Sequence, residues 1–486
     1  MSKLIYPIIG LTLTVVGCAS LNPQPLQSSA KALDVVNIRT IEYSGAGRWY
    51  QFGQAPNPTL PWPQFEVSSF KADINYVTAA ARVQITRSQT IESGRLRPAP
   101  VEQKVDQYIS GTTAWNLIRP ANAPQSATPT ATSQPIAVEE RTAEIWSTPQ
   151  GFLRAALANN AATKPIKGGN EVSFKIGDKY RFVGYINVNN QVVSVKTWID
   201  NPVLGDTLVE TNYSDYQDFD GVQFPVHIVR TQGGYPVLDI NVSSVKVNPP
   251  AEFSVPKEIA NANLSVKVKA DKLADGVYYL TGGTHHSVAI EQSDHVVIVE
   301  APQNEERSLA VIAKVKEIIP NKPIKFLVNT HAHFDHAGGL RTFVDEGSTI
   351  VTHQDNQPYF QKVWAQPRTL NPDRLAHSKK PAAFKTFTDK YVLSDGNRSI
   401  EIYPIAGNGH NDAFALVYLP TEKILIEADA YTPTAPNAPQ SAKPNPYTVN
   451  LYENVQQLKL DVKQIAALHG PNVVTLDNLR TAITVR

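Results

Sequence analysis

The character of the sequence changes after about residue 255, and this change constrains the fold more than any other feature. Before it, residues 191–200 alternate apolar and polar side chains like a half-buried strand, and residues 224–247 have the pattern of a long hairpin that turns at Gly233 and Gly234. After residue 264, short apolar strands alternate with helical segments such as residues 305–319. The sequence therefore predicts a β-rich domain followed by an α/β domain built in layers.

Length and charge agree with this division. A chain of 486 residues is too long for one compact core. The formal net charge of +1 provides no basic surface for nucleic acid, and 36 prolines favour turns and extended segments over a helical bundle. We expect a globular protein that acts on a small molecule rather than on nucleic acid, and the sequence does not predict its oligomeric state.

The first 18 residues resemble the leader of a bacterial lipoprotein. An apolar run over residues 4–17 follows Lys3, and its length fits a signal peptide rather than a membrane-spanning helix. The run ends in the sequence VVGC, which resembles a lipobox, and Cys18 is the only cysteine of the chain, so it has no disulfide partner. We expect lipidation of Cys18 and a place in the bacterial cell envelope. Ala19 in the next position favours the outer membrane, facing the periplasm. The alternative is an ordinary secretory signal with a chance cysteine.

The remaining boundaries follow from composition. Residues 19–34 are expected to be a polar tether, and residues 35–255 a β-rich N-terminal domain of unknown role. Within it, the Pro-, Ala-, Ser- and Thr-rich residues 119–135 have the composition of a mobile loop. Residues 247–256 have the composition of a linker, and residues 264–486 are expected to form the catalytic domain.

Three histidines and one aspartate are concentrated in residues 328–340, VNTHAHFDHAGGL, directly after an apolar strand. In extended backbone, residues two apart point to the same side, so His331, His333 and Asp335 are expected to converge while His336 faces the other side. Imidazole and carboxylate are ligands that zinc favours, and this geometry suits two metal ions better than one.

Two metal ions need more ligands than this loop supplies. His410 in GNGHND, Asp429 after the strand KILIEA, and His469 after IAAL are each polar residues at the edge of an apolar strand. An unpaired imidazole or carboxylate would be costly to bury at such an edge. These three residues are therefore the best candidates to complete a metal site.

The motif THAHFDHAGG resembles the HxHxDH signature of the metallo-β-lactamase superfamily, and His410, Asp429 and His469 follow in the order that this family shows. The resemblance covers residues 264–486 and implies a metallo-β-lactamase-type αββα sandwich that binds two Zn²⁺, with Fe or Mn as possible substitutes. The implied metal ligands are His331, His333 and His410 for one ion, Asp335, His336 and His469 for the second, and Asp429 as the bridge between them.

This set is similar to that of the hydroxyacylglutathione hydrolases and lactonases of the superfamily. It departs from members that place a cysteine near Asp429, and from the diiron branch, which has Glu where this chain has His333. The resemblance implies a hydrolase in which a metal-bridging hydroxide, oriented by Asp335, cleaves an ester, lactone, thioester or lactam bond. Tyr431 is a candidate donor to a substrate oxygen. The basic loop 364–384 is a candidate cap over the site.

Two alternatives remain open. The chain could be a lipid-anchored envelope binding protein whose metallohydrolase domain is secondary or degenerate, or an oxidoreductase that uses iron, because His and Asp ligands also accept iron. The other histidines considered, His227, His285, His286 and His353, are expected to be structural.

Overall fold

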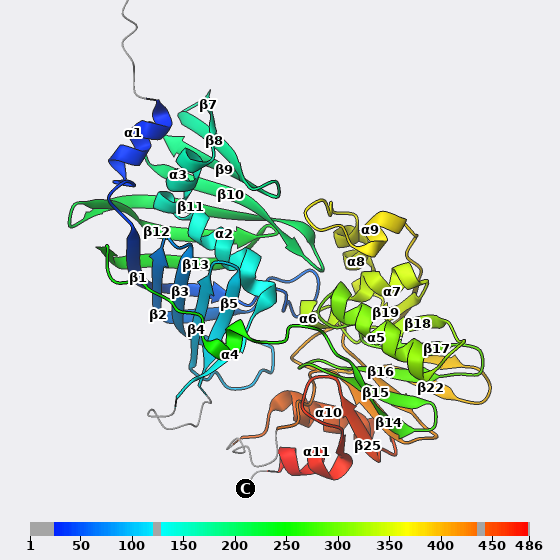
Figure 1. Ribbon diagram of the computed structural model, residues 1–486. Helices are drawn as coiled ribbons and strands as arrows, with labels where there is room; N and C mark the ends of the chain where they lie inside the picture. Colours follow the sequence, from blue (N-terminus) through cyan, green and yellow to red (C-terminus); the bar gives the residue numbers. More distant parts are fainter. Residues whose placement is uncertain (1–23, 120–127, 435–442, 485–486) are drawn as a thin grey trace, which may run out of the picture.

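The computed structural model describes residues 24–119, 128–434 and 443–484, which form two domains connected near α4 (Lys257–Ala260) (Figure 1). Cys18 and the rest of the expected signal peptide lie outside the described residues. Among the described residues, no helix is both long enough and apolar enough to cross a membrane.

The N-terminal domain contains one antiparallel sheet, which has 13 strands within the described residues. The strands are β1 Thr40–Tyr50, β2 Gln64–Asn75, β3 Ala80–Gln89, β4 Gln103–Ser110, β5 Thr113–Ile118, β6 Thr130–Ser133, β7 Ala162–Ile166, β8 Gly169–Ile176, β9 Tyr180–Asn187, β10 Val192–Asn201, β11 Gly205–Phe219, β12 Val222–Gln232 and β13 Tyr235–Val247. Two meanders, β1–β6 and β7–β13, join where β1 pairs with β13. The expected strand over 191–200 and the hairpin at Gly233 and Gly234, both with positive φ, are confirmed.

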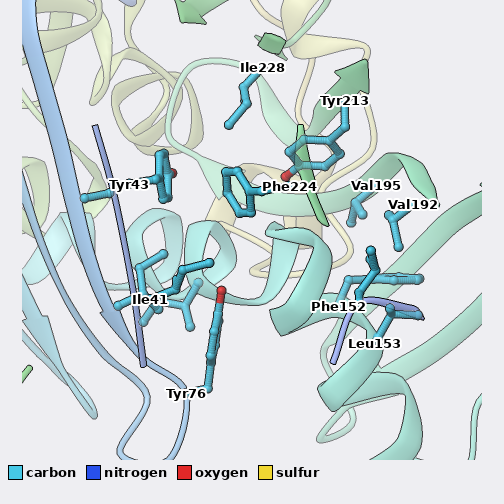
Figure 2. Packing of buried hydrophobic residues seen from close by; sticks show 14 of the residues in the cluster. Ile41, Tyr43, Tyr76, Phe152, Leu153, Val192, Val195, Tyr213, Phe224 and Ile228 are labelled. Carbon is cyan, nitrogen blue, oxygen red and sulfur yellow. The ribbon is translucent and has the colours of Figure 1, made fainter. Parts of the chain in front are cut away.

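Two helices connect the meanders and pack against the sheet (Figure 1). They are α2 (Val138–Ser147) and α3 (Pro149–Ala158), preceded by the 3₁₀ turn η1 (Pro135–Ala137). The Thr148 side chain caps α3 by accepting a hydrogen bond from Gly151. Phe152 and Leu153 of α3 lie beside Val192 and Val195 of the sheet (Figure 2), in a core that both meanders share.

The expected polar tether is wrong for residues after Gln24. Helix α1 (Pro25–Ala32) forms there, and Leu26, Ala30 and Leu33 are buried in the core of the N-terminal domain. Their 3–4-residue spacing places them on one face of the helix, which is the physical reason that this polar-looking stretch is ordered. Of the expected loop 119–135, residues 120–127 lie outside the described residues and 130–133 form β6.

The C-terminal domain has two sheets with helices on both outer faces, so the αββα expectation is confirmed. The first sheet contains β14 Lys269–Ala274, β15 Val277–Thr281, β16 Ser287–Glu291, β17 Val296–Val299, β18 Ile324–Val328, β19 Thr349–His353 and β20 Phe384–Phe387. The second contains β21 Tyr391–Ser394, β22 Ser399–Pro404, β23 Ala415–Leu419, β24 Ile424–Glu427, β25 Gln464–Ala467 and β26 Val474–Thr475. The helices are α5 Glu305–Ile318, α6 Phe334–Ala337, α7 Leu340–Glu346, α8 Asn356–Trp364, α9 Arg374–Ser378, α10 Pro446–Gln457 and α11 Leu476–Ile483.

Two apolar cores hold these layers together. One lies between the sheets and extends to α10 and α11 through Leu451, Val455 and Leu479. The other lies between the first sheet and helices α5, α7 and α8, where Val311, Phe343 and Phe360 are buried. Helix α10 ends at Gln457, and Gln464 begins β25.

Candidate metal centre

The His-rich motif lies where β18 ends, and two glycines allow it to fold tightly. After Val328 the chain has no regular secondary structure up to His333, whose backbone is extended, and then forms the single helical turn α6. A Cβ atom on Gly338 would lie 1.8 Å from the carbonyl oxygen of Gln303, and one on Gly339 would lie 1.9 Å from Oγ of Ser308. Only glycine permits this close approach, which holds α6 against the segment that leads into α5.

The three distant candidates reach the same place from the second sheet. His410 lies in the loop between β22 and β23, while Asp429 and His469 follow the ends of β24 and β25. Strands β24 and β25 are parallel, so their carboxyl ends meet at one edge of the sheet. The fold therefore brings together residues that are up to 138 positions apart in the chain, from His331 to His469.

Asp429 occupies the middle of the cluster. Its Oδ2 lies 3.0 Å from Nε2 of His410, 3.1 Å from Nε2 of His336 and 3.5 Å from Nε2 of His331. Its Oδ1 lies 2.9 Å from Nδ1 of His469. One carboxylate thus contacts histidines of both expected metal sites, as the expected bridging role requires.

The potential ligand atoms form three overlapping groups among the described residues, and two of these groups correspond to the two expected ions. The first group contains His331, His333, His410 and Asp429, with ligand atoms within 4.8 Å of one another. The second contains His285, His336 and His469 at the same separation. The third group combines Glu300 with His331 and His336. The groups thus contain every predicted ligand except Asp335, whose Oδ2 lies 3.3 Å from Nε2 of His285, and they add a histidine that was expected to be structural.

The side chains fit metal ions because their inward nitrogens have no other hydrogen-bond partner among the described residues. These buried atoms are Nε2 of His331, Nδ1 of His333, Nε2 of His336 and Nε2 of His410. Leaving such atoms buried without a partner is costly, whereas a cation in this position would satisfy them together.

The opposite ring nitrogens are held by the protein. Thr330 Oγ1 lies 2.9 Å from Nδ1 of His331, and a Glu300 oxygen lies 3.3 Å from Nδ1 of His336. His333 donates through Nε2 to the carbonyl oxygen of Ala55 at 2.9 Å. Hydrogen bonds of this kind fix the ring orientation of metal-binding histidines.

Burial and neighbouring charge set the ionisation of the cluster. Burial lowers the pKa of His331 to about 4 and that of His333 well below its usual value, so both rings are neutral at pH 7, the form that binds metal. Burial is the largest influence on Asp335 and Asp429 and by itself would raise their pKa. The nearby charge of His336 and the contacts with the other histidines together outweigh it, so the pKa of both carboxyl groups is below its usual value.

The expectation that His336 faces away from the cluster is wrong. Its ring centroid lies 4.5 Å from that of His331, and its Nε2 faces Asp429. The argument from extended backbone fails after His333, because Asp335 and His336 lie in the helical turn α6, where successive side chains are about 100° apart rather than opposite.

A loop of the N-terminal domain enters the cluster, which the sequence did not indicate. Gln54 Nε2 donates to Oδ1 of Asp335 at 2.7 Å, and Gly53 accepts a hydrogen bond from the backbone of Phe334 at 3.1 Å. The Phe334 ring packs edge-on against Phe52 of the same loop, with centroids 5.3 Å apart. Figure 1 shows α6 where the two domains meet. The side chains of the cluster therefore come from the C-terminal domain, and a loop of the N-terminal domain supports them.

A second segment of the N-terminal domain holds the His410 loop. Arg95 donates two hydrogen bonds to the Asp412 carboxylate, at 2.7 and 3.0 Å, and Asn57 donates a third at 2.7 Å. A Cβ atom on Gly409 would lie 1.8 Å from the carbonyl oxygen of Leu96, which explains the glycine before His410.

The basic loop 364–384 contacts the N-terminal domain rather than the metal cluster. Arg368 donates to the carbonyl oxygens of Asn201 and Val203, and the backbone of Thr369 donates to Asp206. Part of the loop borders a cavity of about 1450 Å³, whose lining includes Ala332 and Phe334 of the His-rich motif but none of the predicted metal ligands. The loop thus borders the same cavity as residues of the His-rich motif, and its role as a cap over the site stays a prediction.

Sequence reasoning missed two side chains of the cluster, His285 and Glu300. Glu300 directly follows β17 and is fully buried. The sequence contained a signal for it, because an acidic residue at the end of an apolar strand needs polar partners. His353 and His227 lie outside the two groups, and His286 Nε2 contacts the carbonyl oxygen of Gly470 at 2.6 Å, in agreement with structural roles.

The αββα sandwich, with His and Asp side chains gathered at its strand ends, is the arrangement that the sequence motif led us to expect. Residues 280–433 match the family model described as the metallo-beta-lactamase superfamily. The C-terminal domain has the fold of this superfamily. The match includes His285 and all predicted ligands except His469, which lies beyond the matched residues but reaches Asp429 in the structure.

Individual relatives agree with this family. Metallo-beta-lactamase type 2 of Elizabethkingia meningoseptica is 28% identical over 170 residues, covering 33% of this chain and 61% of that protein. The 2,4-dinitroanisole O-demethylase subunit alpha of Nocardioides sp. (strain JS1661) is 24% identical over 154 residues, covering 32% of this chain and 43% of that protein. The chain thus spans less than two thirds of these curated relatives. A solved metallo-beta-lactamase from Pontibacter korlensis shares 19% identity at a TM-score of 0.35, covering 45% of this chain and 98% of that one.

Proposed function

We propose that the protein is a zinc-dependent hydrolase with a binuclear metal centre. The observation that carries the proposal is the central position of Asp429, whose two oxygens contact histidines of both ligand groups. The buried ring nitrogens without partners support it, because an intact set of inward-facing ligands has no role in a degenerate site.

The side chains would have different roles in such a centre. His331, His333 and His410 would hold one ion, Asp335, His336 and His469 the other, and Asp429 would contact both. When bound, the metal ions would lower the pKa of a water molecule toward about 7 and polarise a substrate carbonyl. Asp335 would orient that water and accept its proton, and the hydrogen bond from Gln54 holds Asp335 in place.

Exposure indicates the side from which a substrate arrives. The side chains of Asp335 and His469 are 34% and 36% exposed, whereas that of His331 is fully buried. A substrate would therefore reach the centre over Asp335 and His469, at the face of the second metal. The Tyr431 side chain is 7% exposed, and its backbone N–H donates to Glu427 at 3.0 Å, so packing accounts for its position without a role as a donor.

Metal content and hydrolysis, measured together, test the proposal. The protein lacking residues 1–18 would be analysed for metals and screened with a lactone, a thioester, a chromogenic β-lactam and 2,4-dinitroanisole, the last two suggested by the names of the relatives. We expect about two zinc ions per chain and hydrolysis of one of these compounds.

The matched variants are Asp335→Ala and Asp355→Ala. Asp335→Ala should lose about one zinc ion and at least about 100-fold in kcat, because it removes both a ligand and the group that orients water. Asp355→Ala changes an acid that precedes α8, outside both ligand groups, and should leave both quantities unchanged. A wild-type protein without bound metal would refute the hydrolase, and iron in place of zinc would favour the oxidoreductase.

A binding role for the N-terminal domain is the second candidate, and a cavity favours it. A cavity of about 250 Å³ lies between the sheet and helix α2, lined by Tyr43, Phe224 and Ile228 (Figure 2) and by the ion pair of Arg230 with Glu144. This volume is just below the usual range for small-molecule sites and suits a single acyl chain. A fluorescent fatty acid should bind the wild-type protein, and Ala81→Phe, which fills the cavity, should abolish that binding. Equal binding by both proteins would contradict this role.

We also propose that Cys18 is lipidated and anchors the protein in the cell envelope, with the outer membrane as the preferred site. The leader pattern described above supports this proposal. Labelled palmitate should be incorporated into the wild-type protein and not into Cys18→Ser, and incorporation into both would refute the anchor.

A further inference from the structure

We propose that His285 is an additional protein ligand of the second metal ion. This inference rests on the proposed binuclear centre and adds to it a residue outside the HxHxDH motif and its three distant partners. It predicts that Asp335, His336 and His469 share their metal ion with a third imidazole.

The backbone places His285 directly beside a predicted ligand. His285 forms an isolated antiparallel β-bridge with His469, and the next residue, His286, donates its backbone N–H to Leu468 at 2.8 Å. The rings of His285 and His469 are stacked with centroids 4.3 Å apart and an angle of 20° between their planes. The segment before β16 is thus attached to the end of β25, and the two imidazoles are held side by side.

The side chain is also oriented toward the second ligand group. Thr284 Oγ1 lies 2.8 Å from Nδ1 of His285, so the opposite nitrogen, Nε2, is directed away from that contact. This Nε2 is buried without a hydrogen-bond partner among the described residues, and it lies 3.3 Å from Oδ2 of Asp335. The ligand atoms of His285, His336 and His469 lie within 4.8 Å of one another. A metal ion would satisfy this nitrogen together with those of its neighbours.

An extra ligand has a chemical consequence for this centre. Each protein ligand added to the second ion removes a position open to water or substrate, and catalytic zinc sites depend on such an open position. The first ion, held by His331, His333 and His410, would then be the one that binds the substrate carbonyl, while the second would be tightly held and largely structural. The second site should therefore bind metal more strongly than its Asp335, His336 and His469 ligands alone would allow.

Metal titration of full-length variants tests the proposal. The key variant is His285→Phe, which keeps the ring volume and the stacking on His469 but has no nitrogen. His285→Ala provides a second substitution, and His353→Ala is the matched control because His353 belongs to the same domain but to neither ligand group. Zinc affinity would be measured by chelator competition, and cobalt-substituted proteins would be compared by their visible absorption, which reports coordination number. Thermal unfolding of the metal-free proteins checks that each variant folds.

The expected result is that wild type and His353→Ala bind about two ions per chain, whereas both His285 variants bind the second ion at least about tenfold more weakly. The cobalt spectrum of the second site should shift accordingly. Two ions bound with wild-type affinity and an unchanged cobalt spectrum in His285→Phe would refute the role of His285 and leave the proposed hydrolase intact. A wild-type protein that binds no metal would refute both.

Discussion

Glu300 shows how one buried side chain can set the geometry of a metal site. It has a left-handed backbone, with φ of +73°, and is fully buried. Its carboxylate accepts hydrogen bonds from the Thr330 hydroxyl and from Asn329 Nδ2 at 3.2 Å, and it lies 3.3 Å from Nδ1 of His336. A non-glycine residue in this conformation is strained, and such strain persists where the surrounding structure requires it. Glu300 therefore orients His336 and supports the loop that carries His331.

Replacing this carboxylate by an amide should weaken metal binding without removing a ligand. Glu300→Gln is expected to lower the zinc affinity about 10- to 100-fold, because His336 loses the anionic partner that fixes its orientation and raises its basicity. Chelator competition measures this change. Glu306→Gln, at an exposed position of α5, is the control and should behave as wild type. Equal zinc affinities for Glu300→Gln and wild type would show that the contact of Glu300 with His336 does not contribute to zinc binding.

The loop between β1 and β2 is the element through which the N-terminal domain reaches the metal cluster. Gly53 has φ of +76°, and a Cβ atom there would lie 2.6 Å from the ring of Phe334, which follows the ligand His333. The loop is therefore held against α6 by close packing and by two hydrogen bonds, from Gln54 to Asp335 and from His333 to Ala55. Displacing the loop should loosen Asp335 and His333 together.

Two alanine substitutions separate backbone strain from this packing. Gly94 also has a positive φ, +81°, but a Cβ atom there would have no neighbouring atom within 4 Å, so Gly94→Ala should cost only about 1–2 kcal/mol of stability. Gly53→Ala should cost more and should also lower zinc affinity, because the new methyl group pushes the loop away from Phe334. Thermal unfolding and chelator competition measure the two effects. Unchanged zinc affinity in Gly53→Ala would mean that loop docking and metal binding are independent.

The sequence predicted elements well where the signal was local. The helix over 305–319 and the hairpin at Gly233 formed as expected, because periodicity and turn residues act over short distances. The predicted ligands converged for a similar reason: each is a polar side chain next to an apolar strand end. Gln54 and Asp335 are 281 positions apart, however, and no local pattern reports their contact. His285 was missed because its position depends on the bridge to His469, which only the assembled fold creates.

At the scale of the whole molecule, two domains with separate cores share one site. The N-terminal core and the two C-terminal cores contain different residues, so the domains should unfold as distinct cooperative units. The proposed metal ligands all belong to the C-terminal domain, whereas Gln54, Ala55 and Arg95 belong to the N-terminal one. Metal should therefore stabilise the C-terminal domain directly and the N-terminal domain only through the docked loop.

Calorimetry with and without zinc tests this division. At free zinc about 100-fold above the dissociation constant, metal should stabilise its domain by about 2.7 kcal/mol, which corresponds to roughly 5–10 °C for a domain of this size. We expect chelation to lower the C-terminal transition by this amount and the N-terminal one by less, with both restored when zinc is returned. Equal shifts of both transitions would indicate one cooperative unit, and no shift would indicate that the cluster does not bind zinc.

The most direct test of the central claim is the anomalous X-ray scattering of zinc-loaded crystals, recorded on both sides of the zinc absorption edge. The account predicts two peaks about 3.5–4 Å apart on either side of Asp429, one beside His331 and His410 and the other beside His336 and His469. A single peak, or none within reach of these side chains, would contradict a binuclear centre.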